Sequence, residues 1–384
     1  MTCASQSVTR KVGGTHLARL NFYPIGNADT TLIELNDGRD ILVDFCYENR
    51  DDGRIDLAGT LQTHLKKRNR DWFDVVAFTH ADNDHVSGAE SFFYLDYAKQ
   101  YQGDGRVHIH ELWVPACFIL DEGPGKSAWA IRQEAKYRLR QGHGILVFGE
   151  PETLLAWMRK QGLDANQRKH LIVHAGTCIP GFTQYSGGVE IFLHAPFSAR
   201  MDEDNSDRNG NSIVLHLTFF EGNHSMYCMM GADAEAATWI DIVTLTRMHG
   251  NHQRLIWDLF HISHHCSYTG LTIMDKGETE TVPEDAIDDL FNQAQRYAIL
   301  ISPSEKIQPF NTTQPPHFQA AAYYKRVADR VNGQFIVTMD WPRGTAKPTP
   351  VVVVTTVAGF QVQKDASKLA GSPVIINHSS PRFG

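Results

Sequence analysis

The chain has 384 residues, of which 42% are hydrophobic and 21% are charged, as is normal for a soluble globular protein with one large domain or two ordinary ones. A chain of this length can bury a sizeable core. The formal net charge of -8 argues against a surface that coats a nucleic-acid backbone as a whole. The net charge does not exclude a local cationic cleft, for example one created by bound metal ions.

The cysteines and the N-terminus indicate the compartment. The six cysteines are scattered and form no CxxC pair, and residues 1–14 contain no apolar core of a signal peptide. The longest apolar runs, such as 351–354, are too short to span a bilayer. We therefore expect reduced thiols, a cytoplasmic location and no membrane partner.

The predicted strands begin after a loose N-terminal tail over residues 1–14. Two apolar runs, Thr31–Leu35 and Asp40–Phe45, flank the turn signal Asn-Asp-Gly and predict a hairpin. Further apolar runs predict strands at 74–80, 107–115, 189–197, 211–220, 225–233, 255–265, 296–304, 334–340 and 350–363.

The predicted helices are spread along the chain after the hairpin. Helical spacing of apolar residues predicts them at 56–72, 127–144, 152–162, 235–248, 286–295 and 318–331, and a glycine stop marks the end of the helix at 127–144. A strand-rich start followed by strands mixed with helices is typical of layered sheets covered by helices. Residues 91–185 are less regular and predict an insertion over one face, and 365–384 predict a polar C-terminal tail.

The stretch FTHADNDHVSGAE, residues 78–90, places four polar side chains at the end of a predicted strand. His80, Asp82, Asp84 and His85 lie within six positions. Imidazole and carboxylate groups are metal ligands, and four of them together need a compensating charge that a divalent cation supplies. The stretch therefore predicts a metal site, against the simpler reading of a polar loop in a chain with 19 histidines.

Three later stretches repeat this pattern of ligand residues beside strands and helices. Asp233 ends one predicted strand, His264 and His265 end another, and His317 precedes a helix. In a layered sheet fold such ends can converge on one rim, so we expect them to form one centre. A carboxylate between two cations is a common arrangement in sites whose two metals are about 3.5–4 Å apart.

The motif at 80–85 resembles a known signature. It stands as His-Ala-Asp-Asn-Asp-His, which is similar to the His-x-His-x-Asp-His signature of the metallo-β-lactamase superfamily, with Asp82 in place of the second histidine. A His-x-Asp-x-Asp-His motif followed by a glycine, here Gly88, resembles the ComEC/Rec2 branch, the hydrolase domain linked to bacterial DNA uptake. The membrane channel that accompanies that domain is absent from this sequence.

Other stretches resemble that branch in the same chain order. They are FYPIGNADTTLIEL with Gly26 and Asp29, DGRDILVDFC with Asp44, NGNSIVLHL with Asn209 and Ser212, GADAE with Asp233, HHCS, and NTTQPPH with His317. Three departures stand out: Ala232 is inserted before the aspartate, Cys266 replaces a glycine, and the segment that supplies a third histidine is missing. His194 and Asn209 are the two candidates for a position near that missing histidine.

The resemblance implies the fold and the ligands. It implies a four-layer αββα sandwich, classed as α/β or α+β, over residues 15–364. It also implies two divalent metal ions, bound by the following residues: His80 and Asp82 at the first ion; Asp84, His85 and His264 at the second; and Asp233 between them. Because Asp82 replaces an imidazole with a harder carboxylate, manganese or magnesium is favoured, with zinc as the close alternative.

Such a centre supports hydrolysis. A bound cation lowers the pKa of water towards neutrality and polarises a phosphoryl or carbonyl oxygen. Asp84 is expected to orient the attacking water, and His265 or His317 to protonate a leaving group. Alternatively, His265 orients the neighbouring ligand and His317 is a surface residue at a helix start. Asp29 and Asp44 are assigned structural roles, in a turn and behind a ligating histidine.

Three functions are compatible with the sequence. The first is a phosphodiesterase or nuclease with a nucleic-acid or nucleotide substrate. The second is a hydrolase of an ester, thioester or lactone, and the third is a binding or regulatory module with a degraded metal site. Two basic stretches, 64–70 and 136–140, are read as solvated helix faces, with a path for a phosphate backbone as the alternative.

Overall fold

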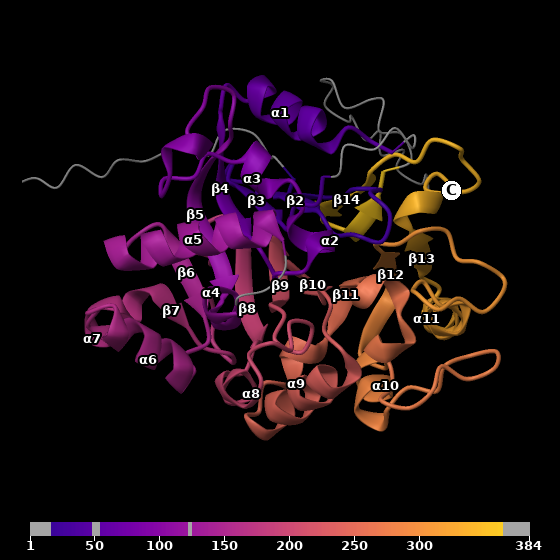
Figure 1. Cartoon of the computed structure of the whole chain (residues 1–384). Helices are drawn as coiled ribbons and strands as arrows, with labels where there is room; N and C mark the ends of the chain where they lie inside the picture. The colour runs from indigo at the N-terminus through magenta and orange to yellow at the C-terminus, as the bar shows by residue number, and fades with distance from the viewer. Residues whose placement is uncertain (1–16, 48–53, 122–124, 364–384) are drawn as a thin grey trace, which may run out of the picture.

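The computed structural model describes residues 17–47, 54–121 and 125–363 (Figure 1). The predicted tails at 1–14 and 365–384 lie outside these ranges. Among the described residues, we find no helix that combines the length and the apolar character needed to cross a membrane.

The described strands form two mixed sheets. The larger one has the order β15-β14-β1-β2-β3-β4-β5-β6-β7 and the smaller one the order β13-β12-β11-β10-β9-β8. The strands of the larger sheet are β1 (Arg19–Phe22), β2 (Thr31–Glu34), β3 (Asp40–Val43), β4 (Trp72–Ala77), β5 (His108–Pro115), β6 (Ile145–Phe148), β7 (Ile172–Val173), β14 (Val351–Thr356) and β15 (Gly359–Val362). Those of the smaller sheet are β8 (Val189–Ala195), β9 (Val214–Glu221), β10 (His224–Met230), β11 (Trp257–His261), β12 (Ala294–Ser302) and β13 (Gln334–Val337). The predicted hairpin is confirmed, because β2 and β3 pair antiparallel.

Helices cover the outer faces of both sheets (Figure 1). They are α1 (Leu57–Lys67), α2 (Asn83–Val86), α3 (Ala89–Phe92), α4 (Ala116–Leu120), α5 (Lys126–Gln141), α6 (Glu152–Lys160), α7 (Ala165–Arg168), α8 (Ser198–Glu203), α9 (Ala236–Met248), α10 (Asp285–Phe291) and α11 (Phe318–Arg330). In α1 the buried residues Leu57, Leu61 and Leu65 recur every four positions, which gives the helix one apolar face towards the larger sheet.

Hydrophobic cores separate the layers. One core lies between the two sheets and contains side chains of both, such as Val43 and Leu215. A second joins the outer face of the larger sheet to α1, α3 and α5, and a third joins the smaller sheet to α9 and α11. The predicted four-layer αββα sandwich is therefore confirmed.

The segment predicted as an insertion, 91–185, is part of the larger sheet. Its strand β5 pairs parallel with β4, β6 pairs parallel with β5, and β7 pairs parallel with β6. The segment thus extends the edge of the sheet and carries its own covering helices, α4 to α7, instead of lying over one face. The glycine stop predicted for the long helix is present, since α5 ends at Gly142 with φ of 86°.

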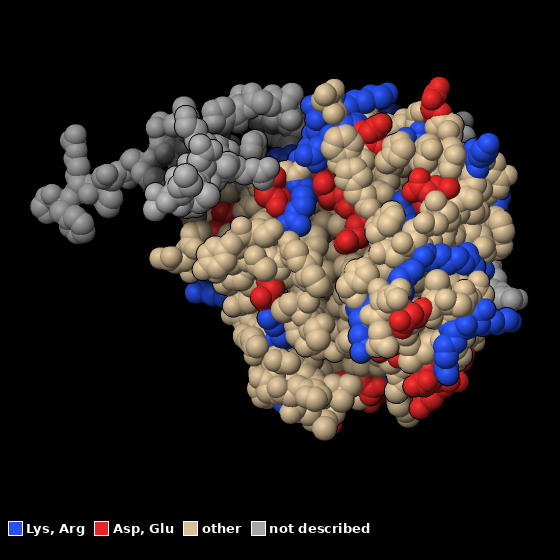
Figure 2. All heavy atoms as spheres, turned by 90° about the vertical axis from the view of Figure 1, so that its left-hand side faces the viewer, with Lys and Arg blue, Asp and Glu red and all other residues tan. Residues whose placement is uncertain are grey.

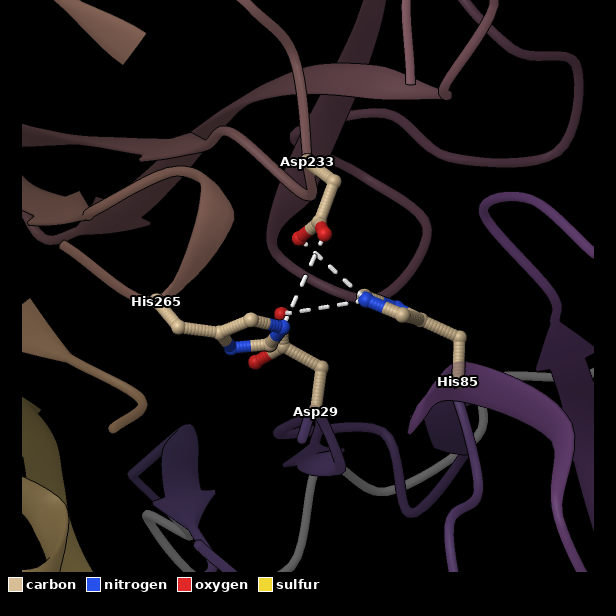
Figure 3. Close-up of side chains that lie close together, drawn as sticks. All are labelled: Asp29, His85, Asp233 and His265. Atoms are coloured by element: carbon tan, nitrogen blue, oxygen red, sulfur yellow. Dashed lines mark ion pairs between the residues drawn. The ribbon is translucent and has the colours of Figure 1, made fainter. Parts of the chain in front are cut away.

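Parallel pairing brings several loops to one edge of the sandwich. In the larger sheet β3 runs parallel to β4, and in the smaller sheet β10 runs parallel to β11. The loops that follow these strands therefore leave their sheets at the same side. Both sheets contribute loops to one site between them (Figure 3).

Candidate metal centre

A buried group of histidine and aspartate side chains lies where these loops meet. It forms two overlapping sets whose ligand atoms lie within 4.8 Å of one another, with His85 in both sets. We call the six residues the His–Asp cluster: Asp29, His80, Asp84, His85, Asp233 and His265. Figure 3 shows that four of them converge from separate segments of the chain.

Local backbone geometry positions the residues of the cluster that follow strands of the smaller sheet. Ala232, between β10 and Asp233, has a positive φ of 45°, and Asp233, which follows it, faces the cluster. The N–H of His264 donates to the carbonyl of Ala232 at 3.0 Å, which ties the loop after β11 to the loop after β10.

Asp44 and Thr79 fix the orientation of two histidines. The carboxylate of Asp44 accepts from the Thr79 N–H and hydroxyl, both at 2.7 Å, and from His85 Nδ1 at 2.8 Å. Because the Thr79 hydroxyl donates to Asp44, it is left to accept from His80 Nδ1, 3.1 Å away. Both imidazoles therefore carry a proton on Nδ1 and direct Nε2 into the cluster, as metal-binding histidines do.

His265 is oriented in the same way by the backbone. Its Nδ1 donates to the carbonyl of Pro303 at 2.9 Å, which leaves Nε2 towards the cluster. Nε2 lies 3.1 Å from Asp84 Oδ2. His265 was predicted either as an acid or as a residue that orients His264, but the structure places its ring among the candidate ligands.

Asp233 lies between three imidazoles. Its Oδ1 is 3.2 Å from His85 Nε2, and its Oδ2 is 3.6 Å from His265 Nε2 and 3.9 Å from His80 Nε2. The two oxygens thus face different histidines. This arrangement suits a carboxylate that is shared between two cations, the role predicted for Asp233.

Asp29 belongs to the cluster, whereas the sequence indicated a structural or supporting role for this turn residue. Its side chain is 3% exposed, and neither carboxylate oxygen has a hydrogen-bond partner among the described residues. Oδ2 lies 3.9 Å from His85 Nε2 and Oδ1 lies 3.1 Å from Nε2 of His261, a histidine that the sequence did not single out. The Asp29 N–H donates to the carbonyl of Asp84, so backbone pairing holds the turn against α2.

The charges of the cluster depend on one another. Burial disfavours the charged form of His85, yet Asp233 raises the pKa of His85 well above its ordinary value. Against the same effect of burial, Asp233 and Asp84 raise the pKa of His265 to about 9. Burial and the nearby His85 lower the pKa of His80 to about 4, so His80 is neutral at pH 7. Protons on His85 and His265 therefore balance the carboxylates in the metal-free protein, and metal binding would release them.

The residues of the cluster fit a divalent cation. Among the buried polar atoms that have no hydrogen-bond partner in the described residues, five belong to the cluster: both carboxylate oxygens of Asp29, Nε2 of His80, Nε2 of His85 and Oδ1 of Asp233. Leaving such atoms unpaired is costly. Imidazole nitrogen and carboxylate oxygen are ligands of zinc and manganese, so a cation would satisfy the atoms that the protein leaves open.

Asp82 lies at the rim of the cluster. Its Oδ1 accepts from Nη1 of Arg208 at 3.0 Å, while its Oδ2 lies 3.9 Å from His80 Nε2. Arg208 also donates to Asp121 at 2.6 Å. No motif or spacing in the sequence singled out Arg208. One oxygen of Asp82 is thus held by a guanidinium and the other faces the proposed first ion.

His264 and His317 point elsewhere. His264 Nδ1 lies 3.0 Å from the hydroxyl of Thr269, and its ring is outside the His–Asp cluster. His317 is 3% exposed and packs edge-on against Tyr268, whose N–H donates to His317 Nδ1 at 3.4 Å. Towards the cluster, the His264 ring makes an edge-on contact with His265, with ring centroids 6.3 Å apart. The roles predicted for these two histidines, as metal ligand and as acid, stay predictions.

The neighbouring histidines 264 and 265 provide a paired test. We expect His265→Ala to lower metal affinity at least about tenfold, because it removes an Nε2 from the cluster, and His264→Ala to leave it unchanged. Calorimetric titration of both variants with Mn²⁺ and Zn²⁺ measures this. A loss confined to His264→Ala would restore the assignment made from the sequence.

Comparisons with known proteins show only a partial likeness of fold. No protein-family model matches the chain, and no curated protein matches it in sequence. A class B3 di-zinc metallo-β-lactamase from an Alaskan soil metagenome is similar in structure, with a TM-score of 0.31 and 12% identity over 86% of this chain and 97% of that one. A long form RNase Z from yeast has a TM-score of 0.35 and 12% identity over 89% and 42% of the two chains. A diphosphatase of the PhnP family has a TM-score of 0.32 and 8% identity over 88% and 99%. Likenesses of this size leave the activity of the chain open.

Proposed function

We propose that this protein is a metal-dependent hydrolase of the metallo-β-lactamase superfamily, in its ComEC/Rec2-like branch, and that it cleaves phosphodiester bonds as a phosphodiesterase or nuclease. The donor set of the cluster carries the proposal. Three imidazoles face the carboxylates of Asp29, Asp84 and Asp233, with Asp82 at the rim. Oxygen-rich sites for two cations suit phosphoryl transfer, and they favour manganese or magnesium over zinc as a tendency.

When bound, the cations would lower the pKa of water and polarise the phosphoryl oxygen. Among the chain's own groups, Asp84 would orient that water and accept its proton. Its side chain is partly exposed, its Oδ2 is held by His265, and it lines a cavity of about 340 Å³. The wall of the same cavity also carries the guanidinium of Arg54, which pairs with Glu305 at 2.8 Å, and the amide of Asn27, whose Nδ2 donates to the carbonyl of Pro315 at 2.6 Å.

The basic stretch 136–140 lies on α5, but it is not solvated throughout, because Arg138 is buried, with 5% exposure. In α5, Arg138 donates to the carboxylate of Glu134 at 2.6 Å, and Lys136 and Arg140 lie over the ring of Trp157. On the face that Figure 2 shows, which is the side of α5, α6 and α7, Lys and Arg side chains alternate with Asp and Glu. We therefore place substrate recognition at the cavity beside Asp84 and not on this face.

The proposal is tested by substrate choice together with metal content. Protein loaded with Mn²⁺, Mg²⁺ or Zn²⁺ is assayed with bis(p-nitrophenyl) phosphate, single-stranded oligonucleotides and cyclic nucleotides, and in parallel with p-nitrophenyl acetate and a lactone. We expect cleavage of the phosphodiesters, greatest with Mn²⁺, lost after chelation and restored by Mn²⁺.

The other outcomes select the alternatives. Metal-loaded protein that cleaves the esters and leaves phosphodiesters intact would be an ester, thioester or lactone hydrolase. Protein that binds less than one metal ion would be a binding or regulatory module. The cytoplasmic location stays a prediction that fractionation of cells tests separately.

A further inference from the structure

His80 is a candidate metal ligand, but an ion bound there needs further donor atoms. It is fully buried, its Nε2 has no hydrogen-bond partner among the described residues, and its Nδ1 is fixed by Thr79. His85 is its neighbour, with ring centroids 3.9 Å apart. However, His85 has Nδ1 bonded to Asp44, so only its Nε2 is available, and one nitrogen lone pair binds one ion. An ion at His80 therefore needs other donors.

Two of these donors are visible around His80. Oδ2 of Asp233 and Oδ2 of Asp82 both lie 3.9 Å from His80 Nε2. The third histidine that the superfamily pattern requires is missing, and His194 does not replace it. His194 Nε2 donates to the carbonyl of Arg254 at 3.0 Å, and its Nδ1 lies 3.3 Å from the hydroxyl of Thr246.

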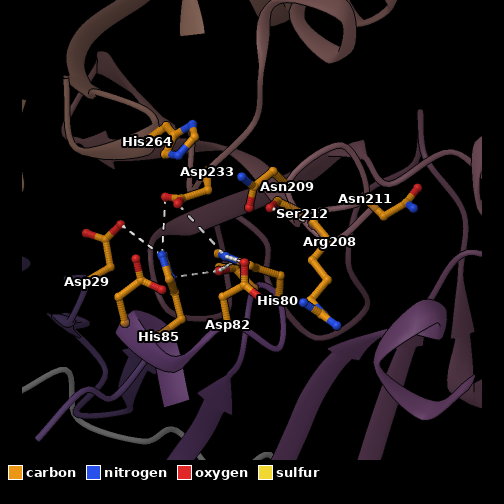
Figure 4. Close-up of polar contacts among 12 residues, drawn as sticks. Asp29, His80, Asp82, His85, Arg208, Asn209, Asn211, Ser212, Asp233 and His264 are labelled. Atoms are coloured by element: carbon orange, nitrogen blue, oxygen red, sulfur yellow. Dashed lines mark hydrogen bonds and ion pairs between the residues drawn. The ribbon is translucent and has the colours of Figure 1, made fainter. Parts of the chain in front are cut away.

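Asn209 lies beside the position that the missing third histidine would occupy. The loop that carries it is anchored to the strand end before His80, because the N–H of Ile213 donates to the carbonyl of Thr79 at 3.1 Å. Asn209 Nδ2 donates to Oε1 of Glu235 at 3.5 Å, close to the turn that holds Asp233. Its Oδ1 is buried and has no hydrogen-bond partner among the described residues. In Figure 4 this amide lies between Asp233 and Arg208, on the side of His80.

We propose that Asn209 Oδ1 completes an ion site with His80 Nε2, Asp82 Oδ2 and Asp233 Oδ2, in the place of the missing third histidine. The inference rests on the proposed function only in requiring that the cluster binds cations. Such a site has one nitrogen and three oxygens. It is harder than a site with three imidazoles, and it should prefer manganese or magnesium to zinc.

Arg208 orients one of the ligands of this site, the carboxylate of Asp82. By donating to Asp82 Oδ1 it leaves Oδ2 as the single oxygen that faces His80. Its guanidinium is itself held by Asp121 at 2.6 Å. The adjacent residues Arg208 and Asn209 thus act together: the first positions a carboxylate, and the second supplies an amide oxygen.

Asn211 shows that a buried amide oxygen without a hydrogen-bond partner does not by itself indicate a metal ligand. Like Asn209 it lies in this loop and has a buried Oδ1 without a hydrogen-bond partner among the described residues. Its Nδ2, however, donates to the carbonyls of Asp204 and Asp207, and Figure 4 shows its side chain directed away from the cluster. Asn211 is therefore a matched control of the same residue type.

The test uses Asn209→Ala, Asn209→His and the control Asn211→Ala in the full chain. Metal content is measured by mass spectrometry, and affinities for Mn²⁺ and Zn²⁺ by calorimetric titration. Asn209→Ala should weaken one of two Mn²⁺ sites at least about tenfold. Asn209→His should shift the site's preference towards Zn²⁺, and Asn211→Ala should change neither.

Two results would overturn the inference: two Mn²⁺ ions bound by Asn209→Ala with wild-type affinity, or an unchanged metal preference in Asn209→His. If Asn209→Ala does not fold, the metal preference of Asn209→His still decides, because disorder of the loop cannot produce a gain in Zn²⁺ affinity. A wild-type protein that binds ions but leaves phosphodiesters intact would contradict the proposed function and leave this inference standing.

Discussion

Replacing Asp233 with asparagine is expected to lower phosphodiester cleavage by at least about 100-fold and to remove at least one metal ion. The carboxylate is 2% exposed and lies within 3.9 Å of Nε2 of His80, His85 and His265. Asparagine keeps the size of the side chain but has no charge and one acceptor oxygen, so it cannot serve two ions. Initial rates with bis(p-nitrophenyl) phosphate and metal content by mass spectrometry measure the effect.

Asp258→Asn is the control for this substitution. Asp258 lies on β11 of the same sheet and accepts from the N–H of Tyr227 at 2.9 Å, outside the His–Asp cluster. It should retain both metal ions and wild-type rates. If Asp233→Asn also retained them, Asp233 would be a structural carboxylate and the shared-ligand assignment would fail.

The strands and helices were largely predictable because their signals are local. The hairpin of β2 and β3 follows from apolar runs around Asn-Asp-Gly, and α5 ends at the glycine that the sequence marked. The place of residues 91–185 was not predictable in the same way. Whether β5 to β7 join a sheet or cover it depends on pairing between distant strands, which periodicity does not encode.

The candidate site was predictable in position but not in every ligand. Residues 80–85 and Asp233 follow strands whose ends meet, which the sequence indicated. The choice between His264 and His265 depends on backbone angles, since His264, His265 and Cys266 all have positive φ, of 50°, 51° and 65°. Such angles are uncommon for these residue types, so spacing alone could not indicate which of the two rings faces the cluster. Asp29 was missed because turn aspartates usually bond their own backbone.

Asp44→Asn is expected to lower both metal affinity and stability. Asp44 is 1% exposed and accepts three hydrogen bonds, two from Thr79 and one from His85 Nδ1. An asparagine can place its NH₂ against His85 Nδ1, which would favour the tautomer with the proton on Nε2 and block that ligand. We expect metal affinity to fall about 10–100-fold. Loss of one partner of a buried pair should lower the free energy of unfolding by about 3–5 kcal/mol.

A second buried aspartate separates the two effects. Asp40 lies four residues earlier, is fully buried, and pairs with His64 and Arg68 away from the cluster. Asp40→Asn should lower the free energy of unfolding, measured by chemical denaturation, and leave Mn²⁺ affinity, measured by titration, unchanged. Because both variants lose a buried charge near β3, an equal loss of affinity in the two would assign the effect to general destabilisation. A loss confined to Asp44→Asn would show that this carboxylate acts through His85.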